Sequence, residues 1–246
     1  MTRVLLFAGN EAHKWHNWEG ATARIKAALG RDPRVHVEVS LDIEDLSRRN
    51  LGDYAVILLN YCNWHDPRPL SEASRAAFLK FLSDGGGLVV HHFSNGAFHF
   101  SLPKAGESDW PEYRKIVRRV WDHSGEKGVR SSHDPFGPFT VNFTAVRHPI
   151  TDGLASFDVV DELYFSQAGE EPIVPLITAR SKRTDKDEPL AWAYEYGHAR
   201  VFQTLLGHSA QTYDAFEPRE MLRRAVAWAA GQEVRPLTAS QDRCSW

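Results

Sequence analysis

Residues 85–92 read Gly85-Gly86-Gly87-Leu88-Val89-Val90-His91-His92, and this stretch decides the fold. The glycines interrupt a helical pattern, and the short apolar run after them predicts a buried strand of a parallel sheet. Two histidines end that strand. In an open α/β sheet, ligands bind in the crevice outside the carboxyl ends of the strands. The stretch therefore predicts both a strand and a polar site at its end.

Strand and helix patterns alternate on the N-terminal side of this stretch. We expect strands at residues 3–8, 35–39, 53–60 and 88–91, and helices at residues 18–29 and 71–82. Strands that alternate with helices of this length favour a mostly parallel sheet with helices on both faces. The predicted fold is a three-layer α/β/α sandwich around a mostly parallel central sheet.

The second half of the chain is less regular. Its patterns predict helices at residues 112–120 and 217–230, strands at 139–143 and 173–179, and a hairpin from 190–194 and 200–205. Two long loops are expected at residues 101–110 and 124–137, and loops of that length are usually functional or disordered. No repeat or change in composition divides the chain. We expect a single domain over residues 1–246, with a peripheral tail at 233–246.

Composition excludes several classes of protein. The 246 residues are 42% hydrophobic and 25% charged, as in ordinary globular proteins. The net charge of -3 is not typical of proteins that bind nucleic acid or an anionic membrane. No apolar run approaches the ~20 residues that span a bilayer, and no signal peptide is expected. Only Cys62 and Cys244 are cysteines, too few for a disulfide framework. We expect a cytoplasmic protein without nucleic-acid or membrane partners.

An ordered set of motifs extends along most of the chain. These motifs are Gly9-Asn10-Glu11-Ala12-His13-Lys14-Trp15-His16, the stretch 85–92, Trp121-Asp122-His123, His148-Pro149-Ile150-Thr151-Asp152-Gly153-Leu154, Asp161-Glu162-Leu163-Tyr164, Pro189-Leu190-Ala191-Trp192, Gly197-His198-Ala199-Arg200-Val201-Phe202 and Leu206-Gly207-His208. Together they resemble the trehalose-utilisation (ThuA-like) family. The resemblance covers roughly residues 4–231. It implies the flavodoxin-like fold of class I glutamine amidotransferases and an enzyme of carbohydrate metabolism, with no nucleotide cofactor.

Glutaminase chemistry is not expected. It requires a cysteine nucleophile on the tight turn that follows the strand ending near His91. That turn reads His91-His92-Phe93-Ser94-Asn95-Gly96, and neither Cys62 nor Cys244 is placed to substitute. Ser94 lacks the flanking glycines of a Gly-x-Ser-x-Gly elbow, so it is not expected to act as a nucleophile.

Five residues are candidate metal ligands, because each falls in a motif of the family and most follow a predicted strand. These are His16, His92, His123, Glu162 and His208. A divalent ion such as zinc or manganese needs three or four imidazole or carboxylate groups that converge. On the fold that the resemblance implies, these loops share one edge of the sheet. No local motif such as His-Glu-x-x-His determines which subset binds, and each histidine has a hydrogen-bonded structural role as its alternative.

Acid–base catalysis is assigned to Glu162, His92 and His123, since a carboxylate beside imidazoles can have a shifted pKa. The alternative for Glu162 is a structural ion pair with an arginine, and for the neighbouring Asp161 we favour a structural role. Sugar binding is assigned to a set of aromatic and polar side chains near the strand ends. The set is Asn10, Trp15, His16, Trp64 and Tyr164. Stacked aromatic rings with polar groups suit a carbohydrate, although the tryptophans could instead cover the sheet edge or a dimer interface.

The predicted function is therefore metal-assisted acid–base chemistry on a glycoside, a disaccharide or a keto-sugar derivative. In this mechanism a divalent metal polarises a sugar carbonyl or a water molecule, and a histidine or Glu162 moves a proton. Another class of function remains open: a non-catalytic sugar-binding or regulatory module on an amidotransferase scaffold that has lost its cysteine. A third is a structural subunit of an oligomer. We expect a homo-oligomer with a small-molecule sugar as ligand.

Overall fold

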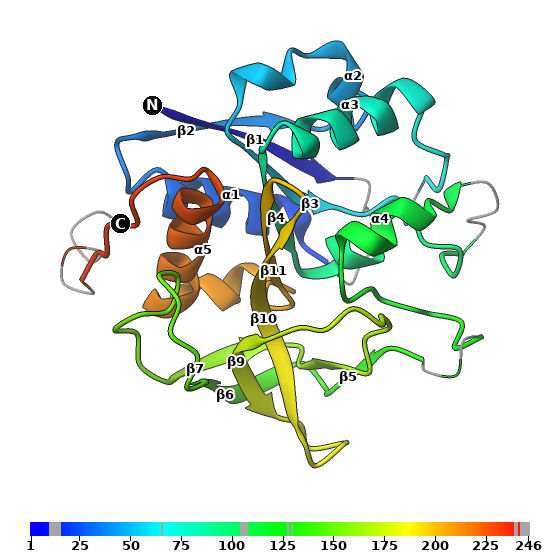
Figure 1. The fold of residues 1–246 in the computed structure, drawn as a ribbon. Helices are drawn as coiled ribbons and strands as arrows, with labels where there is room; N and C mark the ends of the chain where they lie inside the picture. Colours follow the sequence, from blue (N-terminus) through cyan, green and yellow to red (C-terminus); the bar gives the residue numbers. More distant parts are fainter. Residues whose placement is uncertain are drawn as a thin grey trace.

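The computed structural model describes residues 1–9, 16–64, 66–103, 108–126, 128, 130–238 and 241. The strands of its main sheet are β1 (Thr2–Gly9), β2 (Val35–Ser40), β3 (Val56–Tyr61), β4 (Gly87–His91), β6 (Gly137–Phe143), β7 (Phe157–Asp161), β9 (Pro175–Arg180), β10 (Asp187–Tyr196) and β11 (Ala199–Thr204). Within the described ranges these nine strands run in the order β2-β1-β3-β4-β11-β10-β9-β6-β7 (Figure 1). Two short strands, β5 (Ser132–His133) and β8 (Tyr164–Phe165), form a separate pair.

Five of the nine strands form the parallel half of the sheet. β1 pairs in parallel with β2 and β3, β3 pairs with β4, and β4 pairs with β11. Every residue of β3 and β4 is buried, which is why these segments are continuous apolar runs rather than alternating patterns. Their carboxyl ends all point to one edge of the sheet, and that edge carries the site described below.

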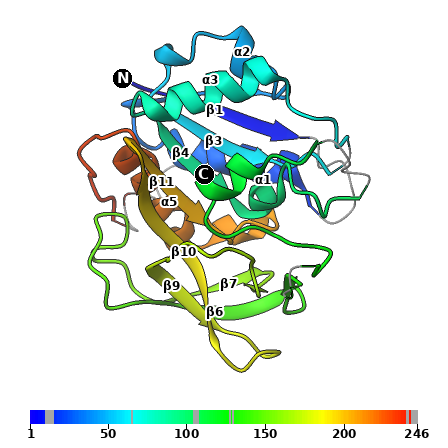
Figure 2. The same cartoon turned by 45° about the vertical axis from the view of Figure 1, so that its right-hand side comes forward.

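Helices cover both faces of the parallel half. The helices are α1 (Trp18–Leu29), α2 (Asp45–Arg48), α3 (Glu72–Ser83), α4 (Pro111–Ile116) and α5 (Phe216–Ala229). α1 and α5 pack on each other, α1 against β1 to β3 and α5 against β4 and β11, while α3 packs with α2 on the opposite face (Figures 1 and 2). The three-layer α/β/α architecture predicted from the sequence is confirmed. Ser71 caps α3 as predicted, because its hydroxyl accepts a hydrogen bond from the Ser74 amide.

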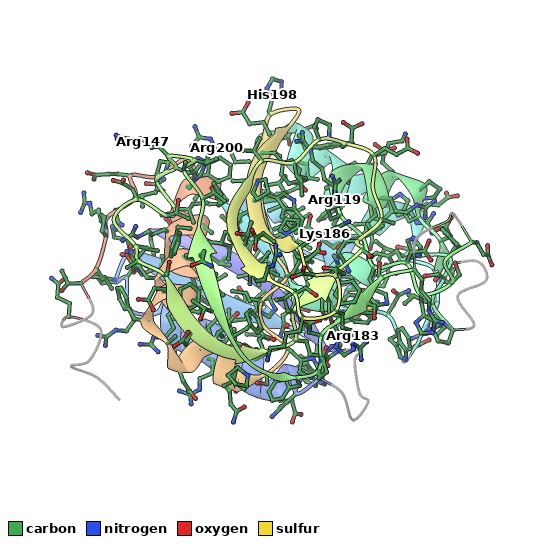
Figure 3. The ribbon with its side chains drawn as sticks, turned by 90° about the horizontal axis from the view of Figure 1, so that it is seen from below. Arg119, Arg147, Arg183, Lys186, His198 and Arg200 are labelled. Carbon is green, nitrogen blue, oxygen red and sulfur yellow. The ribbon has the colours of Figure 1, made fainter. Side chains whose placement is uncertain are left out.

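The other half of the sheet is antiparallel. β10 and β11 form the predicted hairpin, with Gly197 in its turn at a φ of 58°. β10, β9, β6 and β7 then follow in antiparallel pairs. His198 is exposed and projects from the tip of the hairpin (Figure 3). The sequence patterns predict β6, β9 and the hairpin of this antiparallel half, but not β7.

The structure corrects several predicted boundaries. The helix predicted at residues 112–120 ends at Ile116, because the chain straightens and Val120 forms a β-bridge with Ala168. The strand predicted at residues 53–60 begins at Val56, since residues 51–53 form the short 3-10 helix η1 (Leu51–Asp53). β7 was not predicted at all, and β5 lies within the predicted loop 124–137. Among the described residues, no helix has both the length and the apolar composition needed to cross a membrane.

Candidate metal centre

Four side chains from distant parts of the sequence converge at the carboxyl edge of the parallel strands. His16 precedes α1, His92 follows β4, Glu162 follows β7, and His208 follows β11. One ligand atom from each residue lies within 4.8 Å of the corresponding atoms of the other three. Loops that follow the strands of an open α/β sheet meet at this edge, so the topology explains why residues so far apart become neighbours.

The orientation of His92 is set by its backbone and by one hydrogen bond. The residue opens the short 3-10 helix η2 (His92–Gly96) directly after β4, and its φ of 46° lies in the left-handed region. The ring is buried, and its Nδ1 lies 2.7 Å from the carbonyl oxygen of Leu205. Since a carbonyl can only accept, Nδ1 carries the proton and Nε2 presents a lone pair. This tautomer, fixed through the second nitrogen, is typical of a histidine that binds a metal.

The lone pair of His92 Nε2 faces the rest of the cluster. Nε2 lies 3.3 Å from Nε2 of His16 and 2.9 Å from the hydroxyl of Tyr164, which donates to it. The His16 and His208 rings are also in edge contact, with centroids 4.9 Å apart. Burial lowers the pKa of His92 well below its usual value, and the neighbouring His16 and His208 lower it further. His92 is therefore neutral at physiological pH, the state in which imidazole binds metal ions.

Glu162 and His208 form the other half of the cluster. Oε2 of Glu162 lies 3.0 Å from Nδ1 of His208, and both side chains are mostly buried, at 13% and 12% exposure. The two atoms do not have the alignment of a hydrogen bond, and the described residues offer His208 Nδ1 no other partner. A buried polar atom without a partner is costly in a folded protein unless a ligand satisfies it. A cation between the two side chains would satisfy His208 Nδ1.

Asp161 supports these two residues from behind. Its carboxylate is fully buried and accepts hydrogen bonds from the amides of Gly207, His208 and Glu162 and from the hydroxyl of Thr212. Burial raises the pKa of Asp161 to about 6, although these four hydrogen bonds oppose that shift. The structural role that the sequence favours for Asp161 agrees with this arrangement.

The residues present fit a divalent transition metal. The donor set is three imidazoles and one carboxylate, which suits zinc, manganese or iron rather than magnesium or calcium, since the latter prefer all-oxygen sites. Zinc bonds of about 2.0–2.2 Å keep ligand atoms a few ångströms apart, the scale on which these four atoms lie. Both the lack of an aligned hydrogen bond at His208 Nδ1 and the fixed tautomer of His92 agree with this interpretation.

Three residues of the cluster, His16, Glu162 and His208, line a pocket of about 420 Å³ with aromatic walls. The lining residues are His16, Trp64, Phe93, Trp121, His123, His133, Glu162, Tyr164 and His208. Trp64 packs edge-on against His123, with centroids 5.4 Å apart, and Trp121 packs against Tyr164 at 4.6 Å. Rings of this kind give a pocket apolar faces on which a sugar can stack, around a small group of polar atoms.

The structure brings most of the predicted site residues into this pocket. His16, Trp64, Glu162, Tyr164 and His208 line it together with His123, and His92 lies directly behind them. His123 does not belong to the group of four whose ligand atoms converge. Its ligation stays a prediction, and burial lowers its pKa, with Arg130 adding to the shift. Asn10 and Trp15 lie outside the described residues.

Three lining residues were not among the predicted site residues. Phe93 follows His92 in the sequence, and Trp121 belongs to a recognised motif, so both carried a signal that could have been used. His133 carried none, because it lies in a predicted loop with no spacing to another candidate. In the structure its Nδ1 lies 2.8 Å from the carbonyl oxygen of Asp134 and 3.4 Å from Oε1 of Glu162.

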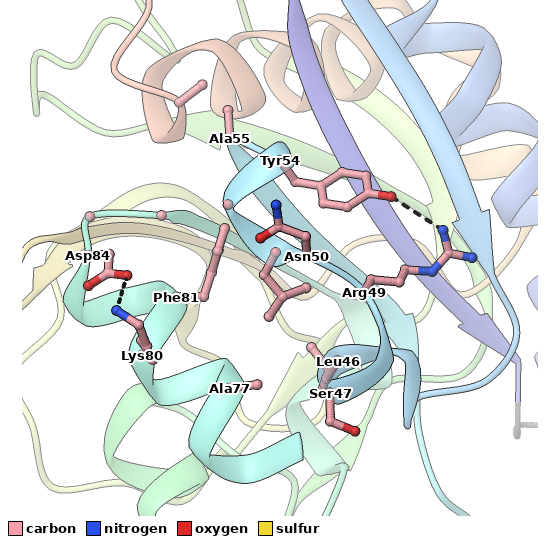
Figure 4. A pocket seen from close by; sticks show the side chains of 15 residues that line it. Leu46, Ser47, Arg49, Asn50, Tyr54, Ala55, Ala77, Lys80, Phe81 and Asp84 are labelled. Atoms are coloured by element: carbon pink, nitrogen blue, oxygen red, sulfur yellow. Dashed lines mark hydrogen bonds and ion pairs between the residues drawn. The ribbon is translucent and has the colours of Figure 1, made fainter. Parts of the chain in front are cut away.

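A larger hollow lies at the opposite ends of the strands, but its charged groups are already paired. It encloses about 540 Å³ between α2 and α3 (Figure 4). Arg49 contacts the hydroxyl of Tyr54 at 3.3 Å, and Lys80 pairs with Asp84 at 2.8 Å. No set of converging ligand atoms is found there among the described residues. The chemistry of the molecule is therefore expected at the carboxyl edge.

The fold and the site define a flavodoxin-like α/β protein with a histidine-rich pocket at the carboxyl edge of its parallel strands. The model of the ThuA family, described as trehalose utilisation, matches residues 3–229. The chain therefore belongs to the ThuA family, as the motifs predict, and this membership supports a carbohydrate-related role. A search of curated proteins finds no match to the sequence.

Solved structures share this fold. A ThuA-like protein from Parabacteroides merdae is 24% identical, with a TM-score of 0.79 over 97% of this chain and 93% of that one. A ThuA-like protein from Bacteroides uniformis is 21% identical, with a TM-score of 0.67 over 92% and 91%. A β-galactosidase from Bacillus circulans is 10% identical, with a TM-score of 0.59, and 95% of this chain corresponds to 32% of that enzyme. The same fold thus occurs both as a whole chain and as one part of a larger glycosidase.

Proposed function

We propose that this protein is a metal-dependent enzyme that acts on a glycoside, a disaccharide or a keto derivative of one. The observation that carries the proposal is the convergence of His16, His92, Glu162 and His208 at an aromatic pocket. Membership of the ThuA family supports a carbohydrate as the substrate class. The residue at the turn after β4 is His92 rather than cysteine, so glutaminase activity is not part of the proposal.

The four converging side chains would hold the cation. When bound, such an ion supplies Lewis-acid polarisation of a sugar carbonyl or of a water molecule. His16, His92 and His208 would contribute imidazole nitrogens, and Glu162 a carboxylate oxygen. Of the three predicted catalytic residues, Glu162 and His92 are then engaged in ligation, and a side chain that holds a cation is not free to carry protons.

Proton transfer is consequently assigned to His123. Its ring lines the pocket beside Trp64, outside the group of four ligands. Its lowered pKa keeps the imidazole neutral near pH 7, so it can accept a proton from a sugar hydroxyl or from the carbon next to a carbonyl. The Tyr164 hydroxyl donates to the single lone pair of His92 Nε2. A cation on that lone pair would displace the hydroxyl, which would then be free to donate to a sugar oxygen.

The aromatic walls would orient the sugar. Trp64 and Trp121 contribute ring faces on either side of Phe93, which contacts both of them at 5.6 Å. Stacking on such faces excludes water and leaves the hydroxyl groups of the sugar to the polar base of the pocket. We also propose that the protein works in the cytoplasm and as a homo-oligomer. One structural relative, from Salmonella typhimurium, is described as a cytoplasmic protein.

The decisive experiment is metal analysis of protein purified without a chelator or a nickel resin. We expect about one transition-metal ion per chain in the wild type, and loss of that ion in His92→Ala and His208→Ala with the circular dichroism spectrum retained. Trehalose and its keto derivatives are then supplied to the loaded and stripped enzymes, and the products are separated by chromatography. Full activity of the stripped enzyme would defeat the metal mechanism. Saturable heat with trehalose but no product would instead favour a sugar-binding module.

A further inference from the structure

We propose that Asp161 is a positioning residue that sets the distance between two metal ligands, Glu162 and His208, through their backbone amides. The inference rests on the function proposed above. Asp161 is neither one of the four candidate ligands nor a lining residue of the pocket. Its carboxylate binds both ligand-bearing segments at once.

The hydrogen bonds of Asp161 are divided between its two oxygens. Oδ1 accepts from the Glu162 amide at 2.8 Å and from the His208 amide at 3.0 Å. Oδ2 accepts from the Gly207 amide and from the Thr212 hydroxyl, both at 2.8 Å. The side chain is 0% exposed, so water does not compete for these donors. Four donors satisfy a carboxylate fully, and the segments that carry them are held in one arrangement.

This arrangement determines where two ligand side chains lie. Glu162 adjoins the end of β7, whereas His208 lies 47 residues beyond Asp161, after β11. β7 and β11 are not neighbours in the sheet, so no strand pairing sets the distance between these two segments. Because both amides bind the same oxygen, the two backbones meet at a point, and the side chains meet again 3.0 Å apart. Supporting groups of this kind are known to control metal affinity.

Asparagine cannot reproduce this pattern. In Asp161→Asn one of the two oxygens becomes an amide nitrogen, which donates. In one orientation of the amide the Glu162 and His208 amides face a donor, and in the other the Gly207 amide, next to His208, does so while the Thr212 hydroxyl turns to accept. In both orientations the backbone segment that carries His208 loses a hydrogen bond. The substitution preserves shape and volume, so it tests the hydrogen bonds rather than the packing.

The test compares metal affinity in the wild type, Asp161→Asn and the control Thr212→Val. Each protein is stripped with a chelator and titrated with zinc against a competing chromophoric chelator, and then with cobalt(II) to record its visible absorption. We expect Asp161→Asn to weaken zinc binding by about 10- to 100-fold and to change the cobalt spectrum. Thr212→Val removes a hydrogen-bond donor whose residue is not a candidate metal ligand. This variant should change the zinc affinity less than threefold and leave the cobalt spectrum unchanged.

The outcomes separate this inference from the function on which it rests. A wild-type protein that binds neither zinc nor cobalt would defeat the proposed function itself. A wild type that binds, together with an Asp161→Asn variant of equal affinity and spectrum, would overturn only the positioning role. A Thr212→Val variant whose zinc binding is weakened as much as that of Asp161→Asn would also overturn the positioning role.

A measurement on the wild type covers the case in which Asp161→Asn does not fold. Binding and positioning are reciprocal, so zinc should slow hydrogen exchange at the amides of Glu162, Gly207 and His208. The exchange is followed by NMR in the stripped and the loaded protein. Unchanged exchange at these three amides upon saturation with zinc would overturn the inference.

Discussion

His92 holds a backbone conformation that a residue with a side chain adopts only when its surroundings demand it. Its φ is 46°, and its ring is fixed by the Leu205 carbonyl at one nitrogen and the Tyr164 hydroxyl at the other. The sharp turn from strand to helix is also where glutaminase chemistry needs its thiol. Here the same turn presents an imidazole lone pair to three other ligand groups. Under the proposed function, this imidazole would bind a metal at a position where a cysteine would act as a nucleophile.

Gly207 shows how tightly the second layer of the site is packed. Its φ is 127°, and a Cβ at this position would overlap the imidazole of the buried His91. We expect Gly207→Ala to lower the free energy of unfolding by about 2–5 kcal/mol, the sum of backbone strain and overpacking. The measurement is urea denaturation followed by circular dichroism.

The matched control is Gly153→Ala. Gly153 has a φ of 70°, but a Cβ there would meet nothing within 4 Å. This variant therefore suffers only the backbone strain, about 1–2 kcal/mol. Equal losses in the two alanine variants would contradict the contact between Gly207 and His91 as the source of the larger effect.

Among the elements, α1 connects local helix chemistry to the site. Its N-cap is Asn17, whose side-chain oxygen accepts a hydrogen bond from the Gly20 amide at 2.8 Å. His16, a candidate ligand, is the residue before this cap. We expect Asn17→Ala to cost about 1 kcal/mol of stability and to weaken zinc binding, because the first turn that anchors His16 frays.

The control for this prediction is Asn17→Asp, which keeps an acceptor at the cap and places a negative charge at the helix N-terminus. Its stability and zinc affinity, measured by urea denaturation and chelator competition, should match or exceed those of the wild type. If Asn17→Ala lost stability with no change in zinc affinity, the link between the cap and His16 would be disproved.

The elements that could be predicted are those whose pattern depends on burial alone. β1, β3 and β4 are continuous apolar runs because both faces of each are covered, and α1 and α3 carry clear caps and apolar faces. β7 lies at an edge of the sheet and alternates buried with exposed residues over only five positions. β5 and β8 have two residues each. Such short segments form through long-range pairing, which leaves no periodic trace in the sequence.

At the scale of the whole molecule, the topology of the sheet predicts where the site lies. It does not predict which of the candidate residues converge there. Four candidates meet because the segments that bear them end at the carboxyl edge or pack beside it. His123 lines the same pocket, yet its place outside the group of four depends on a side-chain direction that spacing does not encode. The sequence favours a structural role for Asp161, but the partners of its carboxylate could not be predicted, since Gly207 and Thr212 lie on another segment of the chain.

Since the ligands come from four separated segments, metal binding should stabilise the entire fold. An ion present at 100 times its dissociation constant adds about 2.7 kcal/mol to the free energy of unfolding. For a chain of this size that corresponds to a rise in melting temperature of about 5–10 °C. Differential scanning fluorimetry of stripped protein with added zinc measures the shift. Magnesium, which prefers oxygen ligands, should produce none, and neither should zinc added to His208→Ala. An equal shift with magnesium would exclude the imidazole site as its source.

The order of the strands also has a consequence for folding during translation. β4 has β11 as one neighbour, and the contact between His92 and Leu205 spans 113 residues of sequence. A ribosome that adds about 5–20 residues per second needs roughly 6–23 s to synthesise that interval. During this interval one edge of the apolar strand β4 has no pairing partner, because β11 has not yet been synthesised. The nascent chain is therefore exposed to aggregation through this edge from the synthesis of β4 until that of β11.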